Sequence, residues 1–147
     1  MLEIAKEAAS CLALVKDYEK HNPLRDARKI TFTGAEGLDV YNISVPFQCK
    51  GKTYIAGRVE PRVTEWSAVR FFERTGPDTY AAALPDTVFE AFQDPFATFI
   101  QGEMVLGGVQ VISDPLDPKR IVSWHTCFYK GPSPWELKLF AIGPSHM

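Results

Sequence analysis

The chain has 147 residues, of which 46% are hydrophobic, and a formal net charge of -2 at pH 7. This length fits one domain with a sizeable core, and the lack of a long basic run argues against a nucleic-acid binder. The chain has no apolar stretch of about 18 residues, so a transmembrane helix is not expected. Three cysteines without a pairing motif and an N-terminus without a signal-peptide pattern predict a cytoplasmic location.

The pattern of apolar residues divides the chain into two parts. Residues 2–20 place apolar side chains at near-helical spacing, which predicts one amphipathic helix that ends before Asn22-Pro23. After it, short aromatic and β-branched segments of period two predict an all-β body. The predicted strands are 29–33, 39–47, 52–60, 67–74, 95–100, 103–112, 120–129 and 136–142. We therefore expect an N-terminal helix at 1–22 and an all-β domain at 23–147.

Two parts of the β domain resemble each other in sequence. Pro46-Phe47 and Pro95-Phe96 lie 49 positions apart, and each pair precedes a turn glycine and a second glycine six residues later. These glycines are Gly51 and Gly57 in the first part and Gly102 and Gly108 in the second. The spacing is that of four short antiparallel strands, so the sequence predicts a partial β-propeller of about two four-stranded blades. Because propellers usually close with about 4 to 8 blades, two blades would associate through their edge strands or belong to something longer.

A dense group of charges, Arg58, Glu60, Arg62 and Glu65, lies at the end of the predicted strand 52–60 and directly after it. Arg58 and Glu60 are two residues apart and therefore point to the same face of the strand. From the spacing alone the pair has two interpretations: an ion pair at the sheet rim, worth about 0 to 1 kcal/mol if exposed, or part of a binding site.

Two further residues allow both a structural and a functional interpretation. Asp94 precedes a proline, where aspartate commonly stabilises a turn, but the same place is the mouth of a first blade strand, where propellers bind ligands. His125 is either a buried strand histidine or a ligand, and no second His or Cys stands at a metal-binding spacing. We therefore expect no metal site.

Three segments carry a resemblance to a known family. They are DVYNISVPF, GKTYIAGRVEPRVTEWSAVRFFE and QDPFATFIQGEMVLGGVQV. Together they resemble the N-terminal half of a family of five-bladed β-propeller proteins related to the inverting mannoside phosphorylases, which includes dual-activity β-1,2-mannosyltransferase/phosphorylases. The resemblance extends from about Phe32 to the C-terminus.

The resemblance implies roles for particular residues. Gln93-Asp94-Pro95-Phe96 resembles a Glu-Asp-Pro-Arg string whose aspartate is the proton donor, although both flanking residues differ. Asn42 and Arg58 resemble the residues that hold the sugar next to the broken bond. The residues that the resemblance places near the site are Glu60, Arg62 and Glu65, with Arg62 and His125 as candidate contributors to phosphate binding.

The implied reaction transfers a mannosyl group between a glycan and phosphate with inversion. Its partners would be a mannose-containing oligosaccharide or mannose-1-phosphate, with inorganic phosphate as co-substrate and no cofactor. A five-bladed ring needs roughly 250 to 300 residues, so we expect the chain to be a fragment with little or no turnover alone. Two alternatives stay open: a non-catalytic sugar-binding or assembly module completed by another chain, and hydrolysis with a second carboxylate about 6.5 to 9.5 Å from Asp94.

Overall fold

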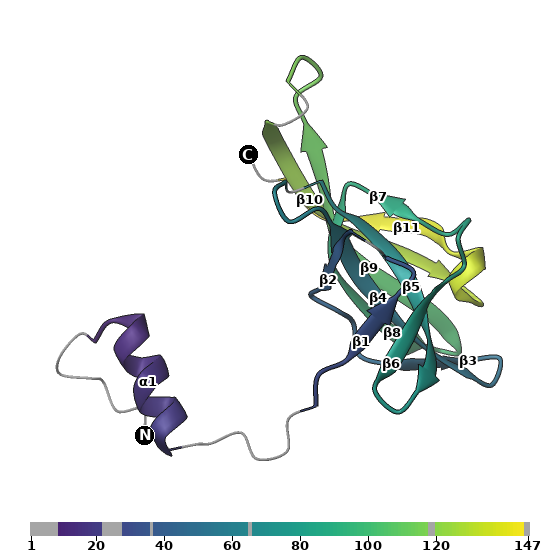
Figure 1. Ribbon diagram of the computed structural model, residues 1–147. Coiled ribbons are helices and arrows are strands. Elements are labelled where there is room, and N and C mark those ends of the chain that lie inside the picture. The colour runs from purple at the N-terminus through teal and green to yellow at the C-terminus, as the bar shows by residue number, and fades with distance from the viewer. Residues whose placement is uncertain (1–8, 22–27, 36, 65, 118–119, 146–147) are drawn as a thin grey trace, which may run out of the picture.

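A computed structural model describes residues 9–21, 28–35, 37–64, 66–117 and 120–145, and in them the chain forms one α-helix and two β-sheets (Figure 1). The helix α1 spans Cys11–His21, which confirms a helix over that part of the predicted segment. None of its residues is buried. Its large apolar side chains, Leu12, Leu14, Val15 and Tyr18, are all exposed, so the predicted amphipathic packing is not seen. The start of that segment, residues 2–8, lies outside the described residues.

The strands form two sheets, called sheet A and sheet B. Sheet A contains β1 (Thr31–Thr33), β2 (Asp39–Tyr41), β3 (Phe47–Cys49), β4 (Lys52–Glu60), β5 (Ala68–Gly76), β6 (Thr79–Ala83) and β7 (Phe89–Glu90). Its order is β1-β6-β5-β4-β2, with β3 also paired to β4 and β7 to β5. Sheet B contains β8 (Phe92–Ile100), β9 (Glu103–Ser113), β10 (Ile121–Gly131) and β11 (Lys138–Ile142), in that order. A short 3-10 helix, η1 (Pro134–Glu136), precedes β11.

The predicted all-β body is confirmed, and its differences from the prediction have local causes. The predicted strand 39–47 is divided into β2 and β3, and Asn42, directly after β2, has a φ of 44°, far from the extended range of a regular strand. Strands β6 and β7 were not predicted from the sequence. The sequence of β6, TYAAA, is rich in alanine, a residue that is depleted in strands.

The sequence repeat corresponds to a repeated hairpin. Lys50 and Gly51 connect β3 to β4, and Gln101 and Gly102 connect β8 to β9. All four residues have positive φ angles between 47° and 82°, as a two-residue type I′ turn requires. The β3–β4 hairpin of sheet A and the β8–β9 hairpin of sheet B therefore have the same kind of two-residue turn.

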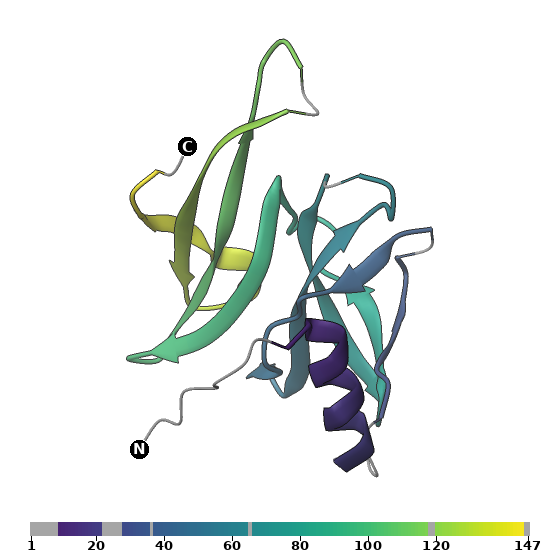
Figure 2. The ribbon, with the colours of Figure 1, turned by 90° about the vertical axis from the view of Figure 1, so that its left-hand side faces the viewer.

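The hydrophobic core shows how the two sheets face each other. Its main cluster lies between them and includes Tyr54 and Phe71 from sheet A and Phe92 and Leu106 from sheet B. A second cluster covers the other face of sheet A and contains Ile55, Val59, Phe72 and Tyr80. Alternate residues of β4 thus contribute to different clusters, which explains why this strand is buried on both faces. Figure 2 shows the two sheets side by side, with the β9–β10 hairpin extending beyond them.

The repeated phenylalanines reveal the relation between the sheets. Phe47 lies in the cluster between the sheets. Phe96 lies on the face of sheet B turned away from sheet A, where it is 44% exposed and packs against Phe128 with ring centroids 5.9 Å apart. The face of sheet A that carries Phe47 and the face of sheet B that carries Phe96 therefore point in the same direction, as the equivalent faces of successive propeller sheets do. The fold is all-β and partly propeller-like.

The close approach of strands at Gly57 leads to a stability prediction. A Cβ atom at Gly57 would lie 2.9 Å from Val40 Cγ1 and 3.2 Å from the Phe72 ring. We expect Gly57→Ala to lower the free energy of unfolding by about 1 to 3 kcal/mol through overpacking, measured by urea unfolding. Gly102→Asn is the control, because its Cβ would have no atom within 4 Å and asparagine tolerates a positive φ. Equal stabilities of the two variants would contradict the prediction.

Candidate functional site

The functional site begins at the end of β4, where two charged side chains are buried together. Arg58 donates to Glu60 Oε2 from Nε at 2.9 Å, and its Nη2 lies 2.8 Å from the same oxygen. The exposed fractions of the two side chains are only 11% and 10%. They continue the face of β4 that carries Tyr54 and Ala56 toward sheet B. The interpretation as an exposed rim ion pair is therefore wrong for this pair.

Asp94 approaches from sheet B at an irregular point of β8. The pairing of β8 with β9 shifts between Gln93 and Phe96, as at a β-bulge. Asp94 lies within this shift and has a φ of 49°. Bulges commonly redirect a side chain next to active sites, and aspartate is among the residues that tolerate this conformation. The bulge and the φ angle together explain how a residue of β8 reaches the end of β4.

Asn42 approaches from sheet A, directly after β2. It also has a positive φ, 44°, and its Nδ2 donates to Asp94 Oδ1 at 2.6 Å. Arg58 Nη1 donates to the same oxygen at 3.3 Å. Asp94 therefore receives hydrogen bonds from two side chains that are 52 and 36 positions away in the sequence. We call Asn42, Arg58, Glu60 and Asp94 the Asp94 cluster.

The cluster has a buried base and an exposed rim. Arg58 and Glu60 are buried, whereas the Asp94 side chain is 50% exposed and Asn42 is exposed as well. Among the described residues, Asp94 uses Oδ1 for both of its hydrogen bonds and Oδ2 for none. A carboxylate oxygen that faces solvent on a fixed side chain can accept or donate a proton, and the adjacent amide and guanidinium can hydrogen-bond hydroxyl groups.

Tyr41 is a further residue of this region that the sequence analysis missed. Its backbone pairs with Arg58 across β2 and β4, and its ring lies under the guanidinium, with Arg58 Cζ 5.1 Å from the ring centroid. Such a cation–π contact helps to hold the guanidinium in place. Only the pairing of β2 with β4 reveals it, because nothing in the DVYN string indicates which strand lies opposite.

Arg62 forms a separate ion pair near the cluster. It donates two hydrogen bonds to Asp39, from Nε at 2.9 Å and from Nη2 at 2.8 Å, and its side chain is 83% exposed. Asp39 is the backbone partner of Glu60, so this pair lies at the same end of sheet A. The hydrogen bonds lower the pKa of Asp39 below its ordinary value of 3.8 and raise the pKa of Arg62.

This pair leads to a prediction on pH dependence. Because the pKa of Asp39 is lower in the folded chain than the ordinary 3.8, its contribution to stability is present above 3.8 and is lost as the pH falls through the folded pKa. In Arg62→Gln we expect the pKa of Asp39 to rise toward its ordinary value, as measured by NMR titration of the Asp39 carboxyl carbon. Arg120→Gln, which removes a contact to Asp114 at 3.7 Å, should leave Asp39 unchanged. An unaltered Asp39 titration in Arg62→Gln would contradict this account.

His125, a further candidate residue, forms no hydrogen bond or ion pair with the Asp94 cluster among the described residues. His125 lies on β10, two strands from β8, and pairs with Gln110 of β9. Its Nδ1 is buried and has no hydrogen-bond partner in the part of the chain that the structure describes. Glu65 lies outside the described residues. Their predicted roles therefore stay predictions.

Metal-binding clusters and membrane-spanning helices are both absent from the described residues. No group of three or more His, Cys, Asp or Glu side chains is placed to hold a metal ion in the part of the chain that the structure describes. Likewise, none of the helices in these ranges has both the length and the apolar character that a membrane span needs.

Comparison with solved structures gives clear relatives. A mannose phosphorylase, MPT-4 from Leishmania mexicana in complex with phosphate ion, is 38% identical with a TM-score of 0.79. A GDP-Man-dependent mannosyltransferase, MPT-1 from Leishmania mexicana, is 35% identical with a TM-score of 0.79. A hypothetical protein from Leishmania major is 39% identical with a TM-score of 0.74. No curated protein sequence matches the chain.

These relatives are longer than the chain. The matches cover 91%, 93% and 90% of this chain but 41%, 43% and 42% of the respective relatives, so the chain spans about two fifths of their length. The resemblance to mannoside phosphorylases and mannosyltransferases that the sequence indicated is thereby confirmed. A family model described as "Protein of unknown function (DUF1861)" matches residues 16–147, and the chain belongs to this family.

Proposed function

We propose that the chain supplies the proton donor and part of the sugar-binding site of an enzyme that transfers a mannosyl group between a mannoside and inorganic phosphate with inversion. The observation that carries the proposal is the meeting of Asn42 and Arg58 on one oxygen of Asp94, at 2.6 and 3.3 Å. The same three residues were chosen from their resemblance to the phosphorylase strings. Chain segments from both sheets are needed to bring them together.

In this proposal Asp94 is the general acid of phosphorolysis. Its proton passes from Oδ2 to the glycosidic oxygen, while the bond from that oxygen to the anomeric carbon breaks. A phosphate oxygen attacks the same carbon from the opposite face, which gives mannosyl phosphate and a free alcohol. In the reverse direction Asp94 accepts the proton of the acceptor hydroxyl. Phosphate is already an anion, so the site needs no second carboxylate to activate the nucleophile.

The sugar next to the broken bond would be held by Asn42 and Arg58. Glu60 binds Arg58 through both Nε and Nη2, so it fixes the plane of the guanidinium and leaves Nη1 toward Asp94. Arginine suits such a position because its planar fork presents several donors in one orientation. Glu60 is therefore a positioning residue in this account, and Glu65 is proposed to lie near the same site.

The phosphate group would be held partly by residues outside the Asp94 cluster. Arg62 is one candidate in this chain. It is exposed, and its guanidinium lies at the same end of sheet A as Glu60. To bind phosphate it would exchange its two hydrogen bonds to Asp39 for bonds to the anion. His125 is a second candidate. The phosphate ion bound to the Leishmania mexicana phosphorylase supports phosphate as the co-substrate, and the mannosyltransferase relative supports mannosyl transfer.

Turnover would require more polypeptide than the chain provides. It spans about two fifths of its phosphorylase and transferase relatives, and a ring of five blades would draw its central site from all of them. We therefore propose that the chain alone is weakly active or inactive. We also propose the cytoplasm as its location, since the reaction uses inorganic phosphate or mannose-1-phosphate.

Hydrolysis is less well supported, because Glu60, the candidate second carboxylate that the structure describes, is already engaged. Glu60 is buried and shares Arg58 with Asp94, so it is poorly placed to activate a water molecule. Incubating the full-length gene product with a β-mannoside, with and without inorganic phosphate, separates the two reactions. We expect mannosyl phosphate that forms only when phosphate is present. Free mannose formed at the same rate without phosphate would contradict the proposal.

A non-catalytic assembly module is the second candidate, and one observation favours it. The outward face of sheet B exposes Phe96 and Trp124, at 44% and 43%, which is a surface that another sheet could cover. A stable complex between the chain and a second polypeptide, with saturable sugar binding but no turnover in any combination, would favour this alternative over the enzyme.

A further inference from the structure

A pocket on the opposite face of sheet A contains an arginine that the proposed reaction does not use. Arg70 of β5 pairs with Gly57 of β4, and directly opposed residues of antiparallel strands share a face. Gly57 alternates with Arg58, so Arg70 points away from the Asp94 cluster. The pocket beside it has a volume of about 310 Å³, which is at the lower end of the range for small-molecule sites, roughly 300 to 1,000 Å³.

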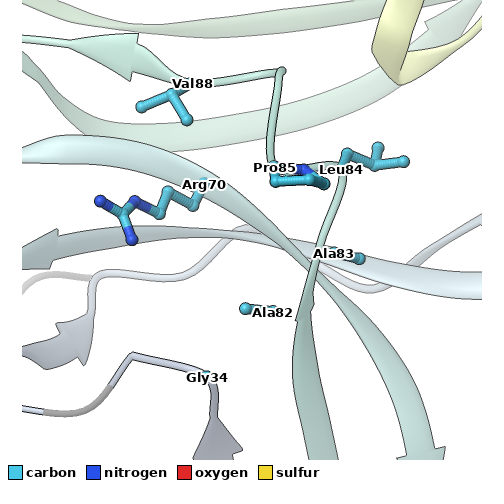
Figure 3. Close-up of a pocket in the computed structure, with 7 residues that line it drawn as sticks. All are labelled: Gly34, Arg70, Ala82, Ala83, Leu84, Pro85 and Val88. Carbon is cyan, nitrogen blue, oxygen red and sulfur yellow. The ribbon is translucent and has the colours of Figure 1, made fainter.

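The charge in this pocket has no counterpart among the described residues. Arg70 forms no hydrogen bond or ion pair with them, and its Nε is buried without a partner. Of the described residues that line the pocket, Arg70 is the only charged one. In Figure 3 its guanidinium lies on one side, and Leu84 and Pro85 lie on the other. A buried donor of a charged group that lacks an acceptor is costly, so it creates a strong preference for an anion.

The walls of the pocket are apolar and held in place. Ala82, Leu84, Pro85 and Val88 contribute to them. Leu84 has a φ of 54°, which is unusual for leucine, and its carbonyl accepts a hydrogen bond from Thr87 N at 2.8 Å. Residues held in such conformations are frequent at ligand sites. One cation within an apolar wall matches a ligand that has one negative charge and a short apolar body.

We propose that this pocket binds a small organic carboxylate, with its carboxylate on the Arg70 guanidinium and its apolar part against Ala82, Pro85 and Val88. The planar fork of arginine fits the two oxygens of a carboxylate. A single negative charge neutralises Arg70, whereas a phosphate dianion would bring a second charge into an apolar pocket. The site is separate from the Asp94 cluster and does not depend on the reaction proposed for it.

The test uses butyrate as the probe and butyramide, its uncharged isostere, as the control. Thermal unfolding of the 147-residue chain is measured at constant ionic strength with increasing concentrations of each. We expect butyrate to raise the unfolding midpoint in a saturable manner, with half-saturation at about millimolar concentration, and butyramide to have at least a tenfold weaker effect. Inorganic phosphate is tested in the same way, and the part of its effect that Arg70→Met removes should be smaller than that of butyrate.

Variants assign the effect to Arg70. Arg70→Met should weaken butyrate binding by about 10-fold to 100-fold, which is the range for one hydrogen-bonded charge, and its midpoint without ligand should be equal to or above that of the wild type. Arg74→Met is the matched control on the same strand, since Arg74 donates to the carbonyls of Gly76 and Pro77; its response to butyrate should be unchanged. Equal responses of wild type and Arg70→Met, equal effects of butyrate and butyramide, or an effect of phosphate that is stronger than that of butyrate and is lost in Arg70→Met would each overturn the proposal.

Discussion

Replacing Asp94 by asparagine is expected to lower phosphate release from mannose-1-phosphate by about 2 to 4 orders of magnitude, the usual effect of removing a general acid or base. The assay uses the full-length gene product with a mannoside acceptor. Asparagine keeps an oxygen that can accept the hydrogen bonds of Asn42 and Arg58, which meet on Asp94 Oδ1 at 2.6 and 3.3 Å. The substitution therefore removes the carboxylate that accepts the proton of the acceptor hydroxyl and preserves the geometry, so kcat should fall while KM changes little.

A second substrate distinguishes an acid from a residue that only holds the sugar. An aryl mannoside with a good leaving group needs little protonation of its glycosidic oxygen, so phosphorolysis of this substrate by Asp94→Asn should be close to that of the wild type. Asp114→Asn, which alters an aspartate at the end of β9 that contacts Arg120 at 3.7 Å, is the control for the substitution itself. Wild-type rates for Asp94→Asn with both substrates would remove Asp94 as the proton donor.

Replacing Glu60 by alanine is expected to lower the free energy of unfolding by about 3 to 5 kcal/mol, because it leaves a buried guanidinium without a main partner. Arg58 is 11% exposed and binds Glu60 through Nε at 2.9 Å and Nη2 at 2.8 Å. Urea unfolding of the 147-residue chain measures the loss. Arg58→Met should be similarly destabilising, since it leaves the Glu60 carboxylate buried.

The double variant tests whether the two losses have one cause. Arg58→Met combined with Glu60→Met removes both charges and should cost less than the sum of the single variants. Lys52→Met is the control on the same strand, because Lys52 pairs with Glu73 at 2.9 Å with side chains that are 56% and 28% exposed, and such exposed pairs contribute about 0 to 1 kcal/mol. A loss in Glu60→Ala no larger than that in Lys52→Met would show that the buried pair does not hold this end of β4.

The sequence was sufficient to predict β4 and the pairing of its charges. The segment 52–60 is a strand with the predicted bounds, and period-two alternation correctly placed Arg58 and Glu60 on one face. What the pattern could not provide was their burial. That depends on β8 of the other sheet lying over the end of β4, and long-range packing of this kind leaves no local pattern.

The two remaining members of the cluster could be found only through the resemblance. Asn42 and Asp94 each occupy a position with positive φ, which asparagine and aspartate tolerate for purely structural reasons. Composition and periodicity therefore could not decide between a turn and a site. The structure decides the geometry, because both side chains meet each other and Arg58. Tyr41 was missed for a related reason, since its contact with Arg58 follows from the register of β2 on β4.

The central claim is that the Asp94 cluster binds the mannosyl group that is transferred. A crystal structure of the full-length Asp94→Asn protein with a β-mannoside tests it most directly. We predict that the terminal mannose lies within hydrogen-bond distance of Asn42 and Arg58, with the side chain at position 94 facing the glycosidic oxygen. A mannoside bound elsewhere, with the cluster free of sugar at saturating concentration, would contradict the account.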